Sequence, residues 1–443
     1  MNCEMKTVIT YGTFDLLHYG HIRLLERAKE LGDYLIVGIT SDDFDKIRGK
    51  INVQQPLAER VAAVKATGLA DQIIVEEYEG QKIDDIQRYG VDCFTVGSDW
   101  VGKFDYLKDY CDVVYLDRTK GVSSSQLRSK DRKLKLGLVG ETPVFLNKFY
   151  EENKYVNGVE INGICTEDVS KFCDEIQKLD IVTNDLDDII KNSDAVYIKS
   201  EHDLHYEHIK KALEAKKNVL CESPVALSKK QCEELFDLAD KNGCVLMDAI
   251  RTAYSTAYAR LLLLVKSGKI GDVVSVEATC TSMKYLKRTK SLLDWGANAM
   301  LPVFDILGTN YKSKTIISRF KDKGNHEDYY TQVDFIYDKA TASIKVAEGA
   351  KSEGSLVIIG TKGYIYVPAP WWKMDYFEVR YEDQEENKRY FYQLDGEGIR
   401  YELVAFARVA QNKEMDYNRI SKDVSLGICG VMEDFLGGEV VEI

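Results

Sequence analysis

Apolar and polar positions along the first 130 residues follow two alternating patterns. The first is a short, mostly apolar run with the length of a buried strand, found at 6–12, 33–42, 71–77, 92–99 and 111–118. The second is a longer stretch whose apolar residues recur every three or four positions, as on one face of a helix, at 20–32, 56–70 and 82–90. Apolar strands that alternate with amphipathic helices predict a parallel, doubly wound sheet.

The same alternation starts again after the charged stretch Lys130–Lys133 and continues to about Arg251. Beyond that point a helix leads into longer strands, and the run 358–367 has Thr-Lys-Gly at its centre, which is typical of a hairpin in a mixed or antiparallel sheet. The chain is therefore predicted to be α/β, with two Rossmann-like domains followed by an α+β domain with a mixed sheet. The expected domains are 1–131, 132–250 and 251–443.

Composition narrows the class of partner. The formal charge of −13 argues against nucleic acid or an anionic membrane surface as the main partner. The ten cysteines form no Cys-x-x-Cys pair, which predicts reduced thiols rather than disulfides or a zinc site. No signal peptide opens the sequence, and the longest apolar run, Leu261–Val265, is far too short to span a membrane. A cytoplasmic protein is expected.

Two of the six histidines, His18 and His21, lie where the first strand gives way to the first helix. The carboxyl end of a strand is where α/β sheets bind ligands, and residues three apart at a helix start share a face. Gly20 leaves no side chain between them. A helix N-terminus also offers free N–H groups and partial positive charge, so the predicted ligand is a phosphate.

The segments YGTFD…HYGH, VGSDW (96–100) and RTKGVSSSQLR (118–128) resemble, in order, the signatures of the glycerol-3-phosphate cytidylyltransferase family, whose hallmark is His-x-Gly-His. The resemblance covers residues 6–130, with SSS in place of the family's STT. It implies an enzyme that joins CTP to a phosphorylated polyol and releases pyrophosphate. It also implies a homodimer and a place in bacterial surface-polymer synthesis, such as that of teichoic acid.

The resemblance assigns roles to individual residues. The implied catalytic residues are His18, His21 and Arg118. The implied nucleotide-binding residues are Gly12, Thr13, Phe14, Lys50 (with Arg48 in a mobile basic loop), Asp99, Trp100, Ser123 and Ser124. The implied acceptor-binding residues are Asp15 and Arg60.

The chemistry expected of these groups is positional and electrostatic. The histidines would donate to phosphate oxygens where charge builds up in the transition state. Asp99 would accept from the exocyclic amine of cytosine, as a carboxylate does elsewhere. The acceptor is already an anion, so no strong general base is needed. Mg²⁺, held mainly by the CTP phosphates rather than by a protein metal site, would offset their charge. Which polyol phosphate serves as acceptor stays open.

From Lys133 onward the chain resembles, more loosely, the Gfo/Idh/MocA oxidoreductase family, most clearly over 202–228. Its functional residues are largely replaced. Thr142 and Phe145 stand at two positions of the glycine-rich turn, Ser223 replaces the catalytic lysine, and Asn298 replaces the proton-transferring histidine. Serine and asparagine do not titrate near neutrality, so NAD(P) is not expected as a cofactor.

Two alternatives remain beside the transferase with an inactive second part. One is a bifunctional enzyme whose second part reduces a keto- or aldehyde phosphate with NAD(P)H to supply the polyol phosphate. The other is a non-catalytic nucleotide-sensing scaffold, which the set His18, His21, Asp99 and Arg118 disfavours.

Overall fold

The computed structural model describes residues 5–47, 53–78, 80–117, 133–156, 158–283, 290–392, 394, 396–412 and 420–443. The chain divides into two compact units, Met1–Arg132 and Lys133–Ile443.

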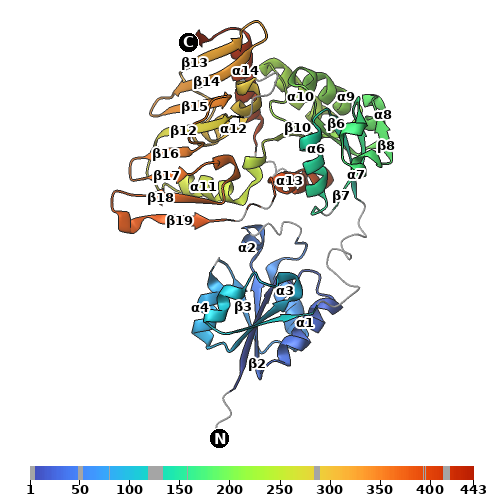
Figure 1. Cartoon of the computed structure of the whole chain (residues 1–443), viewed down its shortest axis with the longest axis vertical. Helices are drawn as coiled ribbons and strands as arrows, with labels where there is room; N and C mark the ends of the chain where they lie inside the picture. Colours follow the sequence, from blue (N-terminus) through green and yellow to red (C-terminus); the bar gives the residue numbers. More distant parts are fainter. Residues whose placement is uncertain are drawn as a thin grey trace. The chain divides into compact units, whose positions relative to one another are not determined.

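The first unit is built on a five-stranded parallel sheet, sheet A, flanked by helices (Figure 1). The order of its strands is β3-β2-β1-β4-β5. Its strands are β1 (Thr7–Gly12), β2 (Tyr34–Thr40), β3 (Gln72–Glu76), β4 (Cys93–Gly97) and β5 (Asp112–Leu116). The helices described are α1 (Tyr19–Lys29), α2 (Asp42–Ile47), α3 (Leu57–Ala66) and α4 (Gln81–Tyr89). The strand order reverses between β1 and β4, and such a switch point opens a crevice at the carboxyl edge of the sheet.

The second unit begins with sheet B, six parallel strands in the order β11-β10-β9-β6-β7-β8. Its strands are β6 (Leu134–Gly140), β7 (Val159–Cys165), β8 (Ile181–Thr183), β9 (Ala195–Lys199), β10 (Asn218–Glu222) and β11 (Leu246–Ala249). The helices that accompany it are α6 (Pro143–Asn153), α7 (Asp174–Gln177), α8 (Leu186–Asn192), α9 (His205–Glu214) and α10 (Lys229–Asn242).

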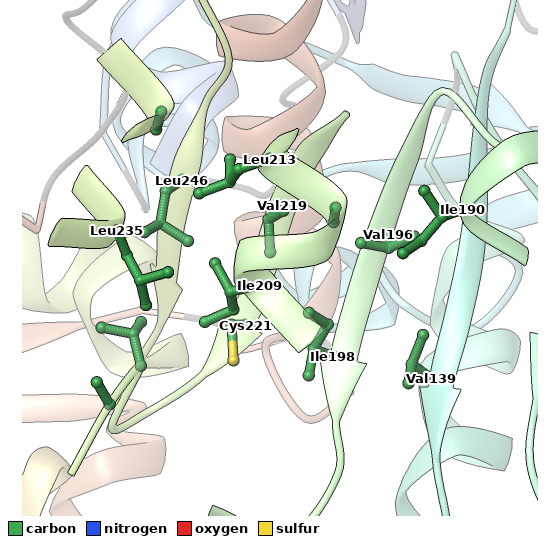
Figure 2. Packing of buried hydrophobic residues seen from close by; sticks show 14 of the residues in the cluster. Val139, Ile190, Val196, Ile198, Ile209, Leu213, Val219, Cys221, Leu235 and Leu246 are labelled. Carbon is green, nitrogen blue, oxygen red and sulfur yellow. The ribbon is translucent and has the colours of Figure 1, made fainter. Parts of the chain in front are cut away.

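One face of sheet B is closed by apolar side chains from these helices. Figure 2 shows Ile209 and Leu213 of α9 beside Val219 of β10, with Leu235 of α10 in the same cluster. All four are at most 1% exposed. Burial of this kind contributes roughly 1.5–3 kcal/mol per large aliphatic side chain. Apolar residues are therefore needed at the buried positions, and their regular spacing predicts these helices and strands.

The rest of the second unit is sheet C, nine strands in the order β19-β18-β17-β16-β12-β15-β14-β13-β20. Its strands are β12 (Val273–Ser282), β13 (Ser313–Asp322), β14 (Glu327–Ile336), β15 (Thr341–Glu348), β16 (Leu356–Gly360), β17 (Tyr364–Val367), β18 (Tyr376–Arg380), β19 (Lys388–Phe391) and β20 (Val441–Glu442). The remaining helices are α11 (Thr256–Lys266), α12 (Ser291–Leu307), α13 (Ile399–Asn412) and α14 (Lys422–Leu436). Helix α12 packs on β12, β14 and β15.

Parallel and antiparallel pairs are mixed in sheet C, and the predicted hairpin is the antiparallel pair β16–β17. The predicted fold class is therefore confirmed: two Rossmann-like parallel sheets are followed by a mixed sheet. Within the described part of the chain, no helix has the length and apolar character needed to cross a bilayer.

Candidate active site

The loop between β1 and α1 folds tightly at the carboxyl edge of sheet A. Phe14 and Leu16 both adopt positive φ angles, 54° and 49°. The Phe14 ring is 2% exposed, and a Cβ on Gly12 would lie 2.9 Å from it. Gly12 is therefore required by the turn itself, because any larger residue would push the Phe14 ring out of its place. Gly12 and Phe14, which were both predicted to bind nucleotide, shape the loop that leads to the histidines.

His18 and His21 lie together at the start of α1. His18 Nδ1 accepts a hydrogen bond from the Gly20 N–H at 3.1 Å and so caps the helix. The two imidazole rings stack, with centroids 3.9 Å apart and planes inclined by 18°, and the Phe14 ring supports His21 edge-on at 5.5 Å. Because Nδ1 of His18 accepts, the neutral ring carries its hydrogen on Nε2, where it is a donor.

The electrostatics of this helix start favour an anion. The first turn of α1 contains no acidic residue. The N-terminal partial charge of the helix therefore favours an anion beside the two imidazoles. The structure brings the two predicted catalytic histidines together in the place where a phosphate is best stabilised.

Arg60 of α3, predicted to bind the acceptor, is completely buried. Its guanidinium donates to three backbone carbonyl oxygens at 2.7–3.0 Å, one of which belongs to Thr13. It also pairs with Asp42 and Asp45 at 2.6 and 3.3 Å. All three guanidinium nitrogens contact the protein, so in this arrangement Arg60 is not open to an acceptor and instead holds the loop in position.

Asp15 is also in the interior, at 3% exposure. Its carboxylate accepts from the backbone N–H groups of Gln54 and Gln55 at 3.0–3.2 Å. Thr13 Oγ1 donates to Asp45 at 2.8 Å. Asp15, expected to bind the acceptor, and Thr13, expected to bind nucleotide, thus tie the β1–α1 loop to α2 and to the start of α3.

Asp99 and Trp100 lie in a short 3₁₀ turn, η1 (Ser98–Trp100), directly after β4. Because β4 pairs in parallel with β1, this turn and the histidine loop share the carboxyl edge of sheet A. Asp99 is exposed. The Trp100 ring lies 5.9 Å from the Phe104 ring and 5.1 Å from Lys103 Nζ. A carboxylate and an aromatic wall therefore stand side by side at this edge.

Sequence reasoning missed Lys82, the second residue of α4. It is 6% exposed, pairs with Glu76 at the end of β3, and lies 4.6 Å from the Tyr11 ring centroid and 5.5 Å from that of Phe104. A buried cation at the same sheet edge is a candidate ligand for an anionic substrate. Its position at the first residue of the predicted helix 82–90, which follows a predicted strand, was the available signal.

The other predicted ligands fall in segments that the structure does not describe. Lys50, Arg118, Ser123 and Ser124, together with Arg48, lie outside the described residues.

Comparison with known proteins identifies the first unit. A family model described as "Cytidylyltransferase-like" matches residues 9–151. Glycerol-3-phosphate cytidylyltransferase of Bacillus spizizenii is 51% identical over 124 residues, which are 28% of this chain and 95% of the relative. The enzyme of that name from Staphylococcus aureus is 48% identical over 126 residues, with the same coverage. The chain belongs to the glycerol-3-phosphate cytidylyltransferase family. This membership rests on its first unit alone.

The second unit is similar to another group. A family model described as "Oxidoreductase family, NAD-binding Rossmann fold" matches residues 134–249, which identifies a Gfo/Idh/MocA-like domain. The uncharacterized oxidoreductase YhhX of Escherichia coli is 26% identical over 191 residues, 41% of this chain and 55% of that protein. Among solved structures, the 3-ketoreductase KijD10 of Actinomadura kijaniata covers 70% of this chain and 99% of its own, with a TM-score of 0.62 at 16% identity. These structures show the fold of the unit.

In this member of the cytidylyltransferase family, the first turn of the second unit differs from a dinucleotide grip. Gly140 is required, because a Cβ there would lie 2.3 Å from the Lys199 carbonyl oxygen. The next residue, Glu141, accepts from Thr166 Oγ1 and from the Glu167 N–H, both at 2.8 Å. Pro143 at the start of α6 has no N–H to offer a pyrophosphate. A carboxylate at the turn would repel that group.

Asn298, at the position expected to carry the proton-transferring histidine, lies on α12 together with Asp294. Asn298, one helical turn later, lies 3.5 Å from Thr252 Oγ1 through its side-chain oxygen. His202 lies 3.8 Å from Asp294. Burial, with the nearby His205 and Lys199, lowers the pKa of His202 to about 3, and burial beside Glu348 raises the pKa of Asp294 to about 7. At neutral pH the His202 imidazole is therefore uncharged.

Proposed function

We propose that the first unit transfers a cytidylyl group from CTP to a phosphorylated polyol, giving a CDP-polyol and pyrophosphate. The observation that carries this proposal is the stacked His18–His21 pair at the N-terminus of α1. Glycerol-3-phosphate is the first acceptor to consider, because the relatives that share this unit bear its name.

The acceptor's phosphate oxygen attacks the α-phosphorus of CTP, and the bond to the pyrophosphate oxygen breaks as the new P–O bond forms. His18 Nε2 and the His21 ring donate to the phosphate oxygens that gain charge. The helix N-terminus adds to this stabilisation. Arg118, Ser123, Ser124 and Lys50 complete the phosphate ligands in this proposal, and Asp99 with Trp100 receives the cytosine.

Mg²⁺ fits this site as a companion of the nucleotide. Among the described residues no group of three His, Cys, Asp or Glu side chains is arranged to hold a metal. In this proposal the ion is bound mainly by the CTP phosphates, where it offsets their negative charge.

Asp15 and Arg60 act as positioning residues in this proposal, since they fix the loop that carries His18. Lys82 is a cation at the carboxyl edge of sheet A, and in this proposal its ammonium group attracts the phosphomonoester. The protein would work in the cytoplasm as a homodimer.

The second unit is proposed to perform no hydride transfer. Glu141 and Pro143 at the first turn, Ser223 and Asn298 all differ from what NAD(P)-dependent chemistry requires. The bifunctional alternative is therefore the weaker candidate.

A direct assay tests the proposed reaction. Purified full-length protein is mixed with CTP, Mg²⁺ and a panel of polyol phosphates, and pyrophosphate release is followed. Turnover with at least one phosphorylated polyol, and none with the unphosphorylated polyol, is the expected outcome. Failure with every phosphorylated acceptor, with CTP hydrolysis also absent, would contradict the proposal.

A further inference from the structure

Four cationic side chains of the second unit lie near Phe145 or Glu397. Lys148 lies on α6 with Phe145, and Lys199 ends β9. Arg251 begins a 3₁₀ turn after β11, and Lys373 ends another (Trp371–Lys373). We call Lys148, Lys199, Arg251 and Lys373 the basic cluster. Its positive charge is opposite in sign to the formal net charge of the chain, which is −13.

The Phe145 ring lies close to two members of the basic cluster, Arg251 and Lys199. The guanidinium carbon of Arg251 lies 5.0 Å and Lys199 Nζ lies 6.0 Å from the ring centroid. Like charges brought this close raise the energy of the folded state unless an anion is present. Phe145 itself is held by Tyr197 of β9, with ring centroids 6.3 Å apart.

The carboxylate of Glu397 lies within ion-pair distance of three members of the basic cluster. It contacts Lys373, pairs with Lys148 at 3.0 Å and lies 4.0 Å from Arg251. Although partial burial opposes it, the two lysines hold the pKa of Glu397 at about 2. Glu397 stands between Gly396 and Gly398, whose φ angles are 63° and 82°. A short glycine-flanked segment thus places a single carboxylate where three cations converge.

The other nearby acids do not balance the charge. Glu402 is completely buried, and burial with Glu222 close by raises its pKa well above the ordinary value. Glu222 accepts a hydrogen bond from Tyr197 Oη at 2.6 Å. Lys199 is half-buried, and no carboxylate of the described residues lies within ion-pair distance of it. The charge of Glu222 also acts on Arg251, so the four cations face two carboxylates, those of Glu397 and Glu222. The basic cluster therefore keeps an excess of positive charge.

The geometry points to a phosphate-ester site: we propose that the basic cluster binds a small phosphomonoester, and that Glu397 is a built-in counter-ion which the phosphate displaces. A dianionic phosphate would satisfy Lys199 together with the groups that Glu397 now serves, through charge-assisted hydrogen bonds. A dinucleotide fits less well, because Glu141 and Pro143 remove the grip for a pyrophosphate at the preceding turn. The proposed ligand is therefore a phosphomonoester and not a nicotinamide dinucleotide.

Opposite changes in affinity test this site in the full-length protein. Binding of glycerol-3-phosphate, in the absence of CTP, is measured by equilibrium dialysis for the wild type and for Glu397→Gln, Lys199→Gln, Lys199→Arg and Lys178→Gln. Lys178 is an exposed lysine of the same unit at the end of α7 and serves as the matched control. All variants lie in the second unit, so any binding by the first unit is common to them. Thermal unfolding checks that each variant is folded.

Glu397→Gln is expected to bind glycerol-3-phosphate about 5-fold more tightly and Lys199→Gln about 10-fold more weakly at one site per chain, the scale of one charge-assisted contact. Lys199→Arg and Lys178→Gln should stay close to the wild type, and transferase turnover with CTP should be unchanged in all of them. Equal affinities in the wild type, Glu397→Gln and Lys199→Gln would overturn the proposal. Displacement of glycerol-3-phosphate by micromolar NADPH would overturn it too, since the cluster would then be a dinucleotide site.

Discussion

At the scale of single residues, His18 has two jobs that one substitution can separate. Its Nδ1 caps α1, and its ring faces His21 in the stack. Asparagine is a good helix cap but has no imidazole. We therefore expect His18→Asn to leave the thermal stability of the protein nearly unchanged and to lower kcat by about 100-fold or more, the scale of losing one transition-state donor.

The partner variant is His21→Leu, which keeps an apolar side chain beside Phe14 and should cause a similar loss of kcat. His326→Ala, in the second unit, is the matched control and should turn over like the wild type. Wild-type kcat in both His18→Asn and His21→Leu would rule out a catalytic part for these histidines.

Single-residue reasoning from sequence worked where spacing alone brings side chains together. Two histidines three apart at a strand–helix junction had to share a face, and the structure stacks them. Arg60 and Asp15 could not be placed in this way, because a polar side chain's burial depends on partners that are distant in the sequence. Asp42, Asp45 and the backbone of Gln54 and Gln55 provide those partners.

At the scale of elements, Arg60 joins α3 to the β1–α1 loop, the end of β2 and α2. Replacing it by methionine keeps much of the volume but leaves Asp42 and Asp45 without their cation. Breaking a buried pair of this kind costs about 3–5 kcal/mol. We expect Arg60→Met to lower the unfolding temperature of the first unit in calorimetry and to leave the transition of the second unit in place.

Arg88→Met, an exposed arginine on α4, is the control and should be close to wild type. One outcome would instead support the prediction that Arg60 binds the acceptor. If Arg60→Met were as stable as the wild type but had a raised KM for the polyol phosphate alone, Arg60 would be an acceptor ligand.

Elements were predictable because burial imposes a period on the sequence. The apolar runs of sheets A and B and the Thr-Lys-Gly turn of β16–β17 were read in this way. The order of the strands within each sheet could not be predicted, because it depends on which distant segments pair in the folded chain. The basic cluster could not be predicted either, because its four cations come from α6, β9 and two 3₁₀ turns, and only the folded chain brings them to Phe145 and Glu397.

At the scale of the whole molecule, we predict a homodimer. Sheet C has α12 on one face, and on the other face lie Ile336, Ile359 and Phe391, which are 51%, 38% and 61% exposed. Two copies of such a face form a self-complementary contact about a two-fold axis. Light scattering at micromolar concentration should give the mass of a dimer, and Ile359→Glu should give a monomer. Leu263→Glu, on α11, should leave the dimer intact, while a monomeric wild type would contradict the prediction.

The last prediction is that the protein does not oxidise NADH or NADPH with any keto- or aldehyde phosphate. Hydride transfer needs a glycine turn for the pyrophosphate, a lysine to polarise the reacting oxygen and an acid to carry its proton. Here the turn carries Glu141 and Pro143, and the last two positions are Ser223 and Asn298. Asp294 remains, but burial lowers the pKa of the neighbouring His202 to about 3, so that imidazole is uncharged at neutral pH.

The measurement combines fluorescence titration of both reduced cofactors with the absorbance of the nicotinamide after keto-phosphates are added. The informative control is the double variant Ser223→Lys with Asn298→His. It restores the titratable lysine and histidine but leaves the turn with Glu141 and Pro143 unchanged. Because the turn governs cofactor binding, this double variant should also stay inactive. Activity in the double variant alone would mean that the turn still binds a dinucleotide and that only the chemistry was lost. Micromolar binding with substrate-dependent oxidation by the wild type would instead favour the bifunctional enzyme.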